Sequence, residues 1–196
     1  MKNLIFGDGG HAFEVSELID FTLGKASTRL NQKEELLHLQ DGDVSESNFF
    51  IGVGNPEIRV KILERWSGHF DYFPTLEHPK TYVSKSSKVS NGCILQFGVV
   101  LSSFALLGRG VLLNWNATVG HHTEIGSGTV VNPGAAISGH CNIGSGVLIG
   151  TGARILEGIA IGSSAIIGAG AVVTKNVPAG KRYIGIPARE IDLHNE

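Results

Sequence analysis

Residues 143–164 read IGSGVLIGTGARILEGIAIGSS, and in this stretch an isoleucine returns at every sixth position. The residue four places after each isoleucine is small or β-branched, and glycine usually follows the isoleucine directly. A helix repeats at about 3.6 residues and a lone strand at about 2, so a strict period of six fits neither. It fits a short strand followed by a corner, with the aliphatic side chain inside and glycine where the backbone needs a positive φ.

The same period continues outward from this stretch in both directions without a slip. Three hexads close one triangular coil of 18 residues, so the repeat predicts about five coils stacked at a strand spacing of about 4.8 Å. A β-sandwich is the alternative, but its strands do not hold one period through so many units. The aliphatic positions are Val83, Val89, Leu95, Leu101, Leu107, Leu113, Val119, Ile125, Val131, Ile137, Ile143, Ile149, Ile155, Ile161, Ile167 and Val173.

The repeat segment, from Val83 to Pro178, resembles the left-handed parallel β-helix of the hexapeptide-repeat acyltransferases. The left hand comes from this resemblance, because periodicity does not fix handedness. The resemblance implies an acyltransferase, although the same fold also carries γ-type carbonic anhydrases and non-enzymatic proteins.

The N-terminal segment lacks this period and consists of two strand–turn–helix units. An apolar run at 2–6 precedes GDGGH and a helical pattern, and an apolar run at 49–53 precedes Gly54, Asn55 and a second helical pattern. A glycine turn between strand and helix directs backbone N–H groups at a phosphate. We predict a small Rossmann-like α/β domain over residues 1–77 and a β-helix domain with a C-terminal tail over residues 78–196.

The two glycine turns, GDGGH at 7–11 and GVGNPEIR at 52–59, give a second resemblance when they precede a hexapeptide helix. The whole chain resembles the sugar O- and N-acetyltransferases, a family that includes sialic acid O-acetyltransferases and UDP-4-amino-sugar N-acetyltransferases. Their small domain holds a nucleotide-linked sugar, which implies substrate-binding roles for Gly9, Gly10, His11 and Gly54. The family's paired aspartates after the second strand are missing here, where residues 25–31 read KASTRLN. For His11, packing at a helix N-terminus is the alternative.

His121 and His122 interrupt the repeat chemically without changing its register. Residues 114–126, NWNATVGHHTEIG, resemble the family's catalytic stretch, and alignment places the catalytic base at His121. An ammonium must lose a proton before it attacks a thioester, and histidine has a suitable pKa to accept it. After the catalytic base the family has an acidic residue, whereas this chain has His122. We assign His121 and His122 to catalysis, and we consider Glu124 as a substitute for the acidic partner of the base. Solvated surface histidines are the alternative.

The resemblance also implies acetyl-CoA as co-substrate, bound in a groove between neighbouring subunits of a homotrimer. A family histidine that contacts acetyl-CoA aligns with Val130, and Thr151 and Ala169 align with residues that offer backbone groups to the pantetheine arm. Lys175, together with Lys181 and Arg182 of the tail, is expected near the CoA phosphates.

His140 follows His122 by 18 residues, so the two are expected to stack on consecutive coils. A γ-type carbonic anhydrase would need three histidines, two of them five residues apart and another from a neighbouring subunit. The spacings here are 1, 18 and 19, and we therefore predict no metal cofactor.

The composition gives no sign of a nucleic-acid or membrane partner, since 16 basic and 18 acidic side chains give a formal charge of -2. Two cysteines are too few for a disulfide framework and have no zinc-binding spacing. The N-terminus lacks the apolar core of a secretion signal, and no apolar run approaches the ~20 residues of a membrane span. A cytoplasmic protein is expected.

These observations predict an acetyltransferase that acetylates a nucleotide-linked amino sugar directly from acetyl-CoA, with a histidine base. O-acetylation of sialic acid is the nearest alternative. A non-catalytic protein that binds CoA or sugar on the same fold is the alternative from another class.

Overall fold

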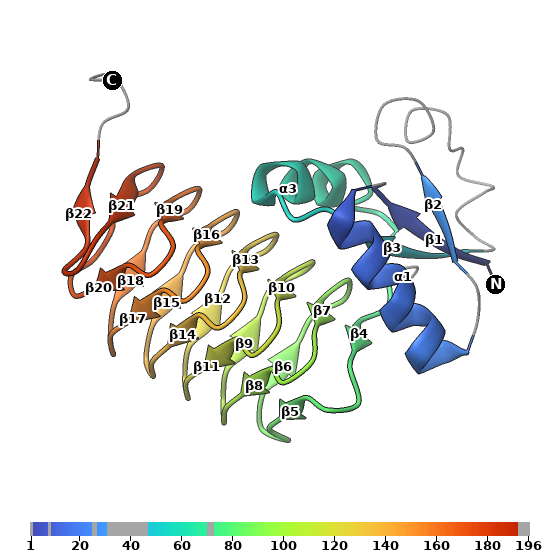
Figure 1. Cartoon of the computed structure of the whole chain (residues 1–196), viewed down its shortest axis with the longest axis horizontal. Coiled ribbons are helices and arrows are strands. Elements are labelled where there is room, and N and C mark those ends of the chain that lie inside the picture. The colour runs from blue at the N-terminus through green and yellow to red at the C-terminus, as the bar shows by residue number, and fades with distance from the viewer. Residues whose placement is uncertain (1, 8, 25–26, 31–46, 70–72, 192–196) are drawn as a thin grey trace.

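The computed structural model describes residues 2–7, 9–24, 27–30, 47–69 and 73–191. A small α/β domain lies beside the first coils of a long parallel β-helix, whose strands run in rows from β4 to β22 (Figure 1). No helix in the described ranges has both the length and the apolar character to cross a membrane.

The small domain is a three-stranded parallel sheet with strand order β2-β1-β3. Its elements are β1 (Lys2–Phe6), α1 (Gly10–Leu23), β2 (Ser27–Leu30), β3 (Ser47–Ile51) and α3 (Pro56–Arg65). Both strand–turn–helix units are therefore present. The second strand, β2, lies within the stretch KASTRLN at 25–31, which has no apolar run typical of a strand.

The two helices of the small domain start differently. Asn55 caps α3, because its side-chain oxygen accepts a hydrogen bond from the Ile58 N–H at 3.2 Å, and Pro56 takes the first helical position. Gly9 precedes α1 without any side-chain cap. The first N–H groups of α1 therefore have no capping side chain, whereas those of α3 are partly satisfied.

The β-helix consists of two-residue strands joined by tight corners, and its three faces are parallel sheets. Sheet I contains β4 (Leu76–Glu77), β7 (Ile94–Leu95), β10 (Leu112–Leu113), β13 (Val130–Val131), β16 (Leu148–Ile149), β19 (Ile166–Ile167), β21 (Arg182–Ile184) and the antiparallel β22 (Arg189–Glu190). Sheet II contains β5 (Tyr82–Val83), β8 (Val100–Leu101), β11 (Thr118–Val119), β14 (Ala136–Ile137), β17 (Arg154–Ile155) and β20 (Val172–Val173). Sheet III contains β6 (Lys88–Val89), β9 (Leu106–Leu107), β12 (Glu124–Ile125), β15 (Asn142–Ile143) and β18 (Ala160–Ile161).

The register between coils is 18 residues throughout the repeat, as when Thr118 pairs with Val100 and with Ala136. Nearly all the aliphatic positions of the repeat are buried in one continuous core, with Val83 and Val89 only partly covered at its first coil. Sheet I has a strand before the repeat and another after it, so the helix has about six turns rather than five. Because β4 pairs with β7, the first coil begins at Leu76, two residues before position 78.

The small domain covers the outer face of sheet I through an apolar cluster. Ala12, Val15, Leu18 and Ile19 of α1 pack with sheet residues that point outward, and that outer set is Leu76, Ile94, Leu112, Val130 and Leu148. This packing fixes α1 against the β-helix (Figure 1).

Arg59 of α3 forms a second connection between the two domains. Its side chain is fully buried, and its guanidinium donates to the carbonyl oxygen of Gly110 in the β-helix at 2.7 and 2.9 Å. It also donates to the carbonyls of Ile51 and Val53 at 2.8 and 2.9 Å. Burial lowers the pKa of Arg59 to about 10, which leaves the group charged at neutral pH.

Candidate functional site

The glycines of the two turns separate into those that packing requires and those that it does not. A Cβ on Gly52 would lie 2.5 Å from Ile5 Cγ2, and Gly7 has a φ of +125°. A Cβ on Gly9, Gly10 or Gly54 would meet no atom within 4 Å, and none of the three has a positive φ. The fold therefore does not need glycine at these three positions, and their bare backbone faces open space beside the start of α1 and α3.

His11 lies in the first turn of α1, beside Gly9 and Gly10, and its ring is largely enclosed. Its side chain is 12% exposed, and its Nδ1 is 3.0 Å from Glu14 Oε2. Burial lowers the pKa of His11 below its ordinary value, while the hydrogen bond to Glu14 acts in the opposite direction. A neutral ring that donates from Nδ1 leaves Nε2 as an acceptor. This Nε2 is buried with no hydrogen-bond partner among the described residues.

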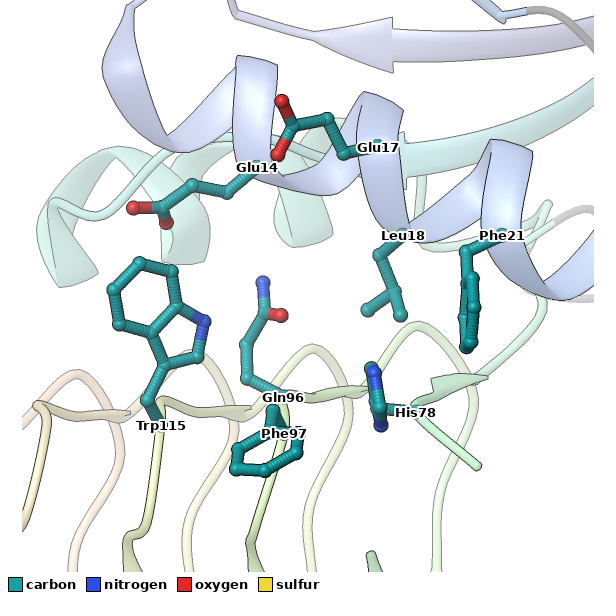
Figure 2. A pocket seen from close by; sticks show the side chains of 8 residues that line it. All are labelled: Glu14, Glu17, Leu18, Phe21, His78, Gln96, Phe97 and Trp115. Carbon is teal, nitrogen blue, oxygen red and sulfur yellow. The ribbon is translucent and has the colours of Figure 1, made fainter. Parts of the chain in front are cut away.

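A cleft of about 370 Å³ continues from Glu14 along the seam between α1 and the β-helix. Figure 2 shows Glu14 and Glu17 of α1 facing Gln96 and Trp115 across this cleft. Gln96 is only 3% exposed, and its Nε2 has no hydrogen-bond partner in the described part of the chain. A buried amide without a partner indicates a polar ligand, because leaving it unpaired costs about 1–3 kcal/mol. No sequence pattern indicated this cleft.

His121 and His122 stand at the corner between β11 and β12, which we call edge II/III. Both side chains are exposed, and their Nδ1 atoms are 3.3 Å apart. A Cβ on Gly139, one coil further, would lie 2.7–3.0 Å from the His121 ring, so a glycine is needed there to make room for the imidazole. Within the described residues, no hydrogen bond joins Glu124 to either histidine.

The residues expected to bind CoA occupy different parts of the β-helix. Thr151 and Ala169 are exposed on the corner between sheets I and II, which we call edge I/II, in the same column as Trp115. Lys175 is exposed on edge II/III, in the same column as His121. Val130 is fully buried in the cluster beneath the small domain, so its side chain does not reach the surface of this chain.

In the tail, Lys181 is ion-paired with Glu190 and Arg182 is exposed in β21. Their side chains are not gathered around Lys175, because sheet I carries β21 whereas Lys175 follows the last strand of sheet II. The structure thus brings His11 close to the open glycines and to the cleft, but it leaves His121 at another edge of the same chain.

Comparison with known proteins gives one family model and a series of relatives. The model "Bacterial transferase hexapeptide (six repeats)" matches residues 140–175. UDP-N-acetylbacillosamine N-acetyltransferase of Bacillus subtilis is 31% identical over an alignment of 114 residues that covers 48% of this chain. The match spans about half the length of that curated relative, 51%.

Solved structures match over nearly the full length of both chains. A perosamine N-acetyltransferase from Caulobacter crescentus, in complex with CoA and GDP-perosamine, is 26% identical with a TM-score of 0.86 and covers 98% of each chain. The acetyltransferase domain of PglB from Neisseria gonorrhoeae, in complex with acetyl coenzyme A, is 29% identical with a TM-score of 0.85 and covers 97% of this chain and 98% of that one. The predicted left-handed β-helix behind a small α/β domain is confirmed.

Proposed function

We propose that this chain, a member of the hexapeptide-repeat sugar acetyltransferases, transfers an acetyl group from acetyl-CoA to the amino group of a nucleotide-linked amino sugar. The observation that carries this proposal is the likeness across both domains to a perosamine N-acetyltransferase that holds CoA and GDP-perosamine, and to an acetyltransferase domain that holds acetyl coenzyme A. A β-helix alone would support only acyl transfer in general, whereas the small domain adds the place for a nucleotide sugar.

In this proposal His121 is the general base. It accepts a proton from the sugar ammonium, and the freed amine attacks the thioester carbonyl to form the amide. The CoA thiolate leaves and receives a proton, so no covalent bond to the enzyme forms. With its Nδ1 3.3 Å away, a neutral His122 accepts the Nδ1–H of His121 and directs the Nε2 lone pair outward. It lacks the negative charge with which a carboxylate would raise the pKa of the base.

We place the acceptor in the small domain and the adjoining cleft. The open backbone at Gly9, Gly10 and Gly54 and the uncapped start of α1 suit the phosphates of a nucleotide. His11 supports a nucleotide at this place, because its buried Nε2 lacks a partner and, as an acceptor, suits a hydroxyl or base N–H of the nucleotide. The sugar then lies in the cleft, where Glu14 suits an ammonium and Gln96 suits a hydroxyl.

We further propose a homotrimer whose sites are shared between neighbouring chains. The cleft, Thr151 and Ala169 border edge I/II, whereas His121 and Lys175 lie on edge II/III of the same triangular coil. A cyclic assembly places edge I/II of one chain against edge II/III of the next and so completes each site. CoA then lies in the groove between the two chains, with Lys175 near its phosphates. A cytoplasmic location stays a prediction, consistent with the two buried, unpaired cysteines.

The first experiment measures acetyl transfer from acetyl-CoA to a panel of UDP- and GDP-linked amino sugars and to sialic acid. We expect N-acetylation of a nucleotide-linked amino sugar, and a loss of about 10²–10⁴-fold in kcat for His121→Ala. His122→Asn is the matched variant and should cost less, because it removes only the partner of the base. CoA binding without turnover on any acceptor would contradict the proposal, and a larger loss for His122→Asn would reverse the two roles.

A second experiment tests the shared site. Co-expression of His121→Ala with a cleft variant, Gln96→Ala, gives mixed trimers in which one chain supplies an intact cleft and its neighbour an intact base. If both single variants are inactive, random mixing should restore about a quarter of the sites. No recovery in trimers that contain both chains would contradict a site shared between subunits.

A further inference from the structure

Three imidazoles converge on edge II/III. One ring nitrogen from each of His121, His122 and His140 lies within 4.8 Å of the other two, and all three side chains are exposed. The rings of His122 and His140 are stacked at a centroid distance of 5.0 Å, and the His121 ring meets the His140 ring edge-on at 4.9 Å. No carboxylate or thiol among the described residues belongs to this group.

The backbone holds two of these histidines in an uncommon conformation. His122 has a φ of 57° and His140 a φ of 56°, in the left-handed region. At the equivalent turn position of the other two edges glycine is the rule, with Asn116 and Ser164 as exceptions; the glycines are Gly92, Gly98, Gly110, Gly128, Gly134, Gly146, Gly152 and Gly170. A side chain in this region costs of order 1 kcal/mol and persists where its surroundings or its function retain it. On edge II/III itself the same position is occupied by Gly158 and by Phe104, which has a φ of 59° and a ring centroid 4.9 Å from that of His122. The turn therefore does not require histidine, and we attribute the two imidazoles to a function of their rings.

Three imidazoles without a carboxylate form a ligand set for a transition-metal dication such as Zn²⁺. Zn–N bonds of about 2.0–2.1 Å in a tetrahedral site separate the ligand nitrogens by about 3.3–3.4 Å. His121 and His122 already have this separation, at 3.3 Å. Rotation of the exposed side chains can bring a ring nitrogen of His140 to the same ion. The backbone N–H of His140 donates to the His121 carbonyl at 2.9 Å, which holds the two residues side by side.

We propose that His121, His122 and His140 bind one Zn²⁺-like ion per chain, and that the bound ion inhibits acetyl transfer. Metal coordination occupies a lone pair of His121 and removes the base from the reaction, so the second half of this inference rests on the proposed function. The ion is an inhibitor and not a cofactor, so the spacing argument against a carbonic-anhydrase-like centre still holds. Metal availability would then control the activity.

Zinc binding is tested first, without any acetylation assay. Full-length protein stripped of metal by a chelator is titrated with ZnCl₂ by calorimetry or against a chromophoric chelator. We expect one Zn²⁺ per chain and at least a tenfold weaker Kd in His140→Asn, because asparagine keeps the left-handed turn but removes a ligand. His78→Asn, a histidine on another edge, is the control and should leave the Kd unchanged. An equal Kd in wild type and His140→Asn would overturn the site.

Inhibition is measured second, with each variant's rate divided by its own rate in chelator. The Zn²⁺ concentration that halves the rate should follow the Kd and rise at least tenfold in His140→Asn. Stoichiometric zinc binding with no fall in turnover would overturn the inhibitory role. A protein without acetyltransferase activity that still binds zinc through His140 would refute the proposed function and leave the metal site standing.

Discussion

Each coil of the β-helix is stabilised by the coils before and after it, whereas the small domain depends on a surface of the other domain. β11, for example, pairs only with β8 and β14, at the same 18-residue register as its neighbours. The sheet of the small domain has three strands, and its helix α1 buries its apolar face against sheet I. A repeat can therefore tolerate local change, while the small domain, and the acceptor site that we propose there, requires its contacts with the helix.

The largest loss of stability in the small domain is expected from Arg59→Met. The substitution leaves the carbonyl oxygens of Gly110, Ile51 and Val53 without their donor, and we expect the small domain to lose about 3 kcal/mol of unfolding free energy. Urea unfolding in a Trp115→Phe background measures this, since the buried Trp66 then reports on the small domain alone.

Arg65→Met is the matched control, because Arg65 lies on the same helix but is exposed. It should change the unfolding free energy by no more than about 0.5 kcal/mol. Equal losses for the two variants would mean that the small domain does not depend on the buried guanidinium.

A second prediction separates the glycines of the small domain. Gly52→Ala should destabilise it by about 2 kcal/mol, because the new Cβ would lie 2.5 Å from Ile5 and 2.9 Å from the Ala12 backbone. Gly54→Ala should leave the melting temperature nearly unchanged and weaken the binding of UDP and GDP measured by calorimetry. Unaltered nucleotide affinity in Gly54→Ala would remove this glycine from the acceptor site.

The β-helix could be predicted from the sequence because every coil repeats the same steric requirement. The buried positions from Leu95 to Val173 follow directly from the period of six. The small domain was predictable only as strand–turn–helix units. β2 was not, because Ser27–Leu30 has no continuous apolar run and its pairing with β1 depends on residues far apart in the chain.

A second period in the sequence explains what was missed at Val130. The outward positions of sheet I are Ile94, Leu112, Val130, Leu148 and Ile166, an apolar residue every 18 positions. Such a stripe predicts a cover over that face, and the small domain provides it over Ile94, Leu112 and Val130. Alignment alone gave Val130 a role with the cofactor, whereas the stripe places its side chain in the domain interface. No comparable sequence pattern indicated that the cleft and His121 lie on different edges of the β-helix, or that Gln96 is buried. Both depend on the folded coil.

A third prediction concerns the contacts between coils. The buried Thr129 hydroxyl donates to the Gly144 carbonyl at 2.8 Å and accepts from the Val147 N–H at 3.1 Å. Thr129→Val should cost about 1–2 kcal/mol in thermal unfolding, since it leaves both groups unpaired, while Thr118→Val on the outer face of β11 should cost much less. A similar loss for both would show that these hydroxyl bridges add nothing to the backbone ladder.

The smallest effect is expected from acid, and it should come from His11 of the small domain. Burial lowers the pKa of folded His11 below the value of 6.5 for a free imidazole, so near and below that pH the unfolded chain binds a proton that the folded domain does not. Stability should therefore fall as the pH drops below about 6.5 and level off once the folded ring is also protonated. The difference between wild type and His11→Gln, followed by Trp66 fluorescence in urea between pH 8 and 5, isolates this contribution. If the wild type instead gained stability relative to His11→Gln as the pH fell, His11 would be held charged, which would reverse its proposed role as a neutral acceptor in the nucleotide site.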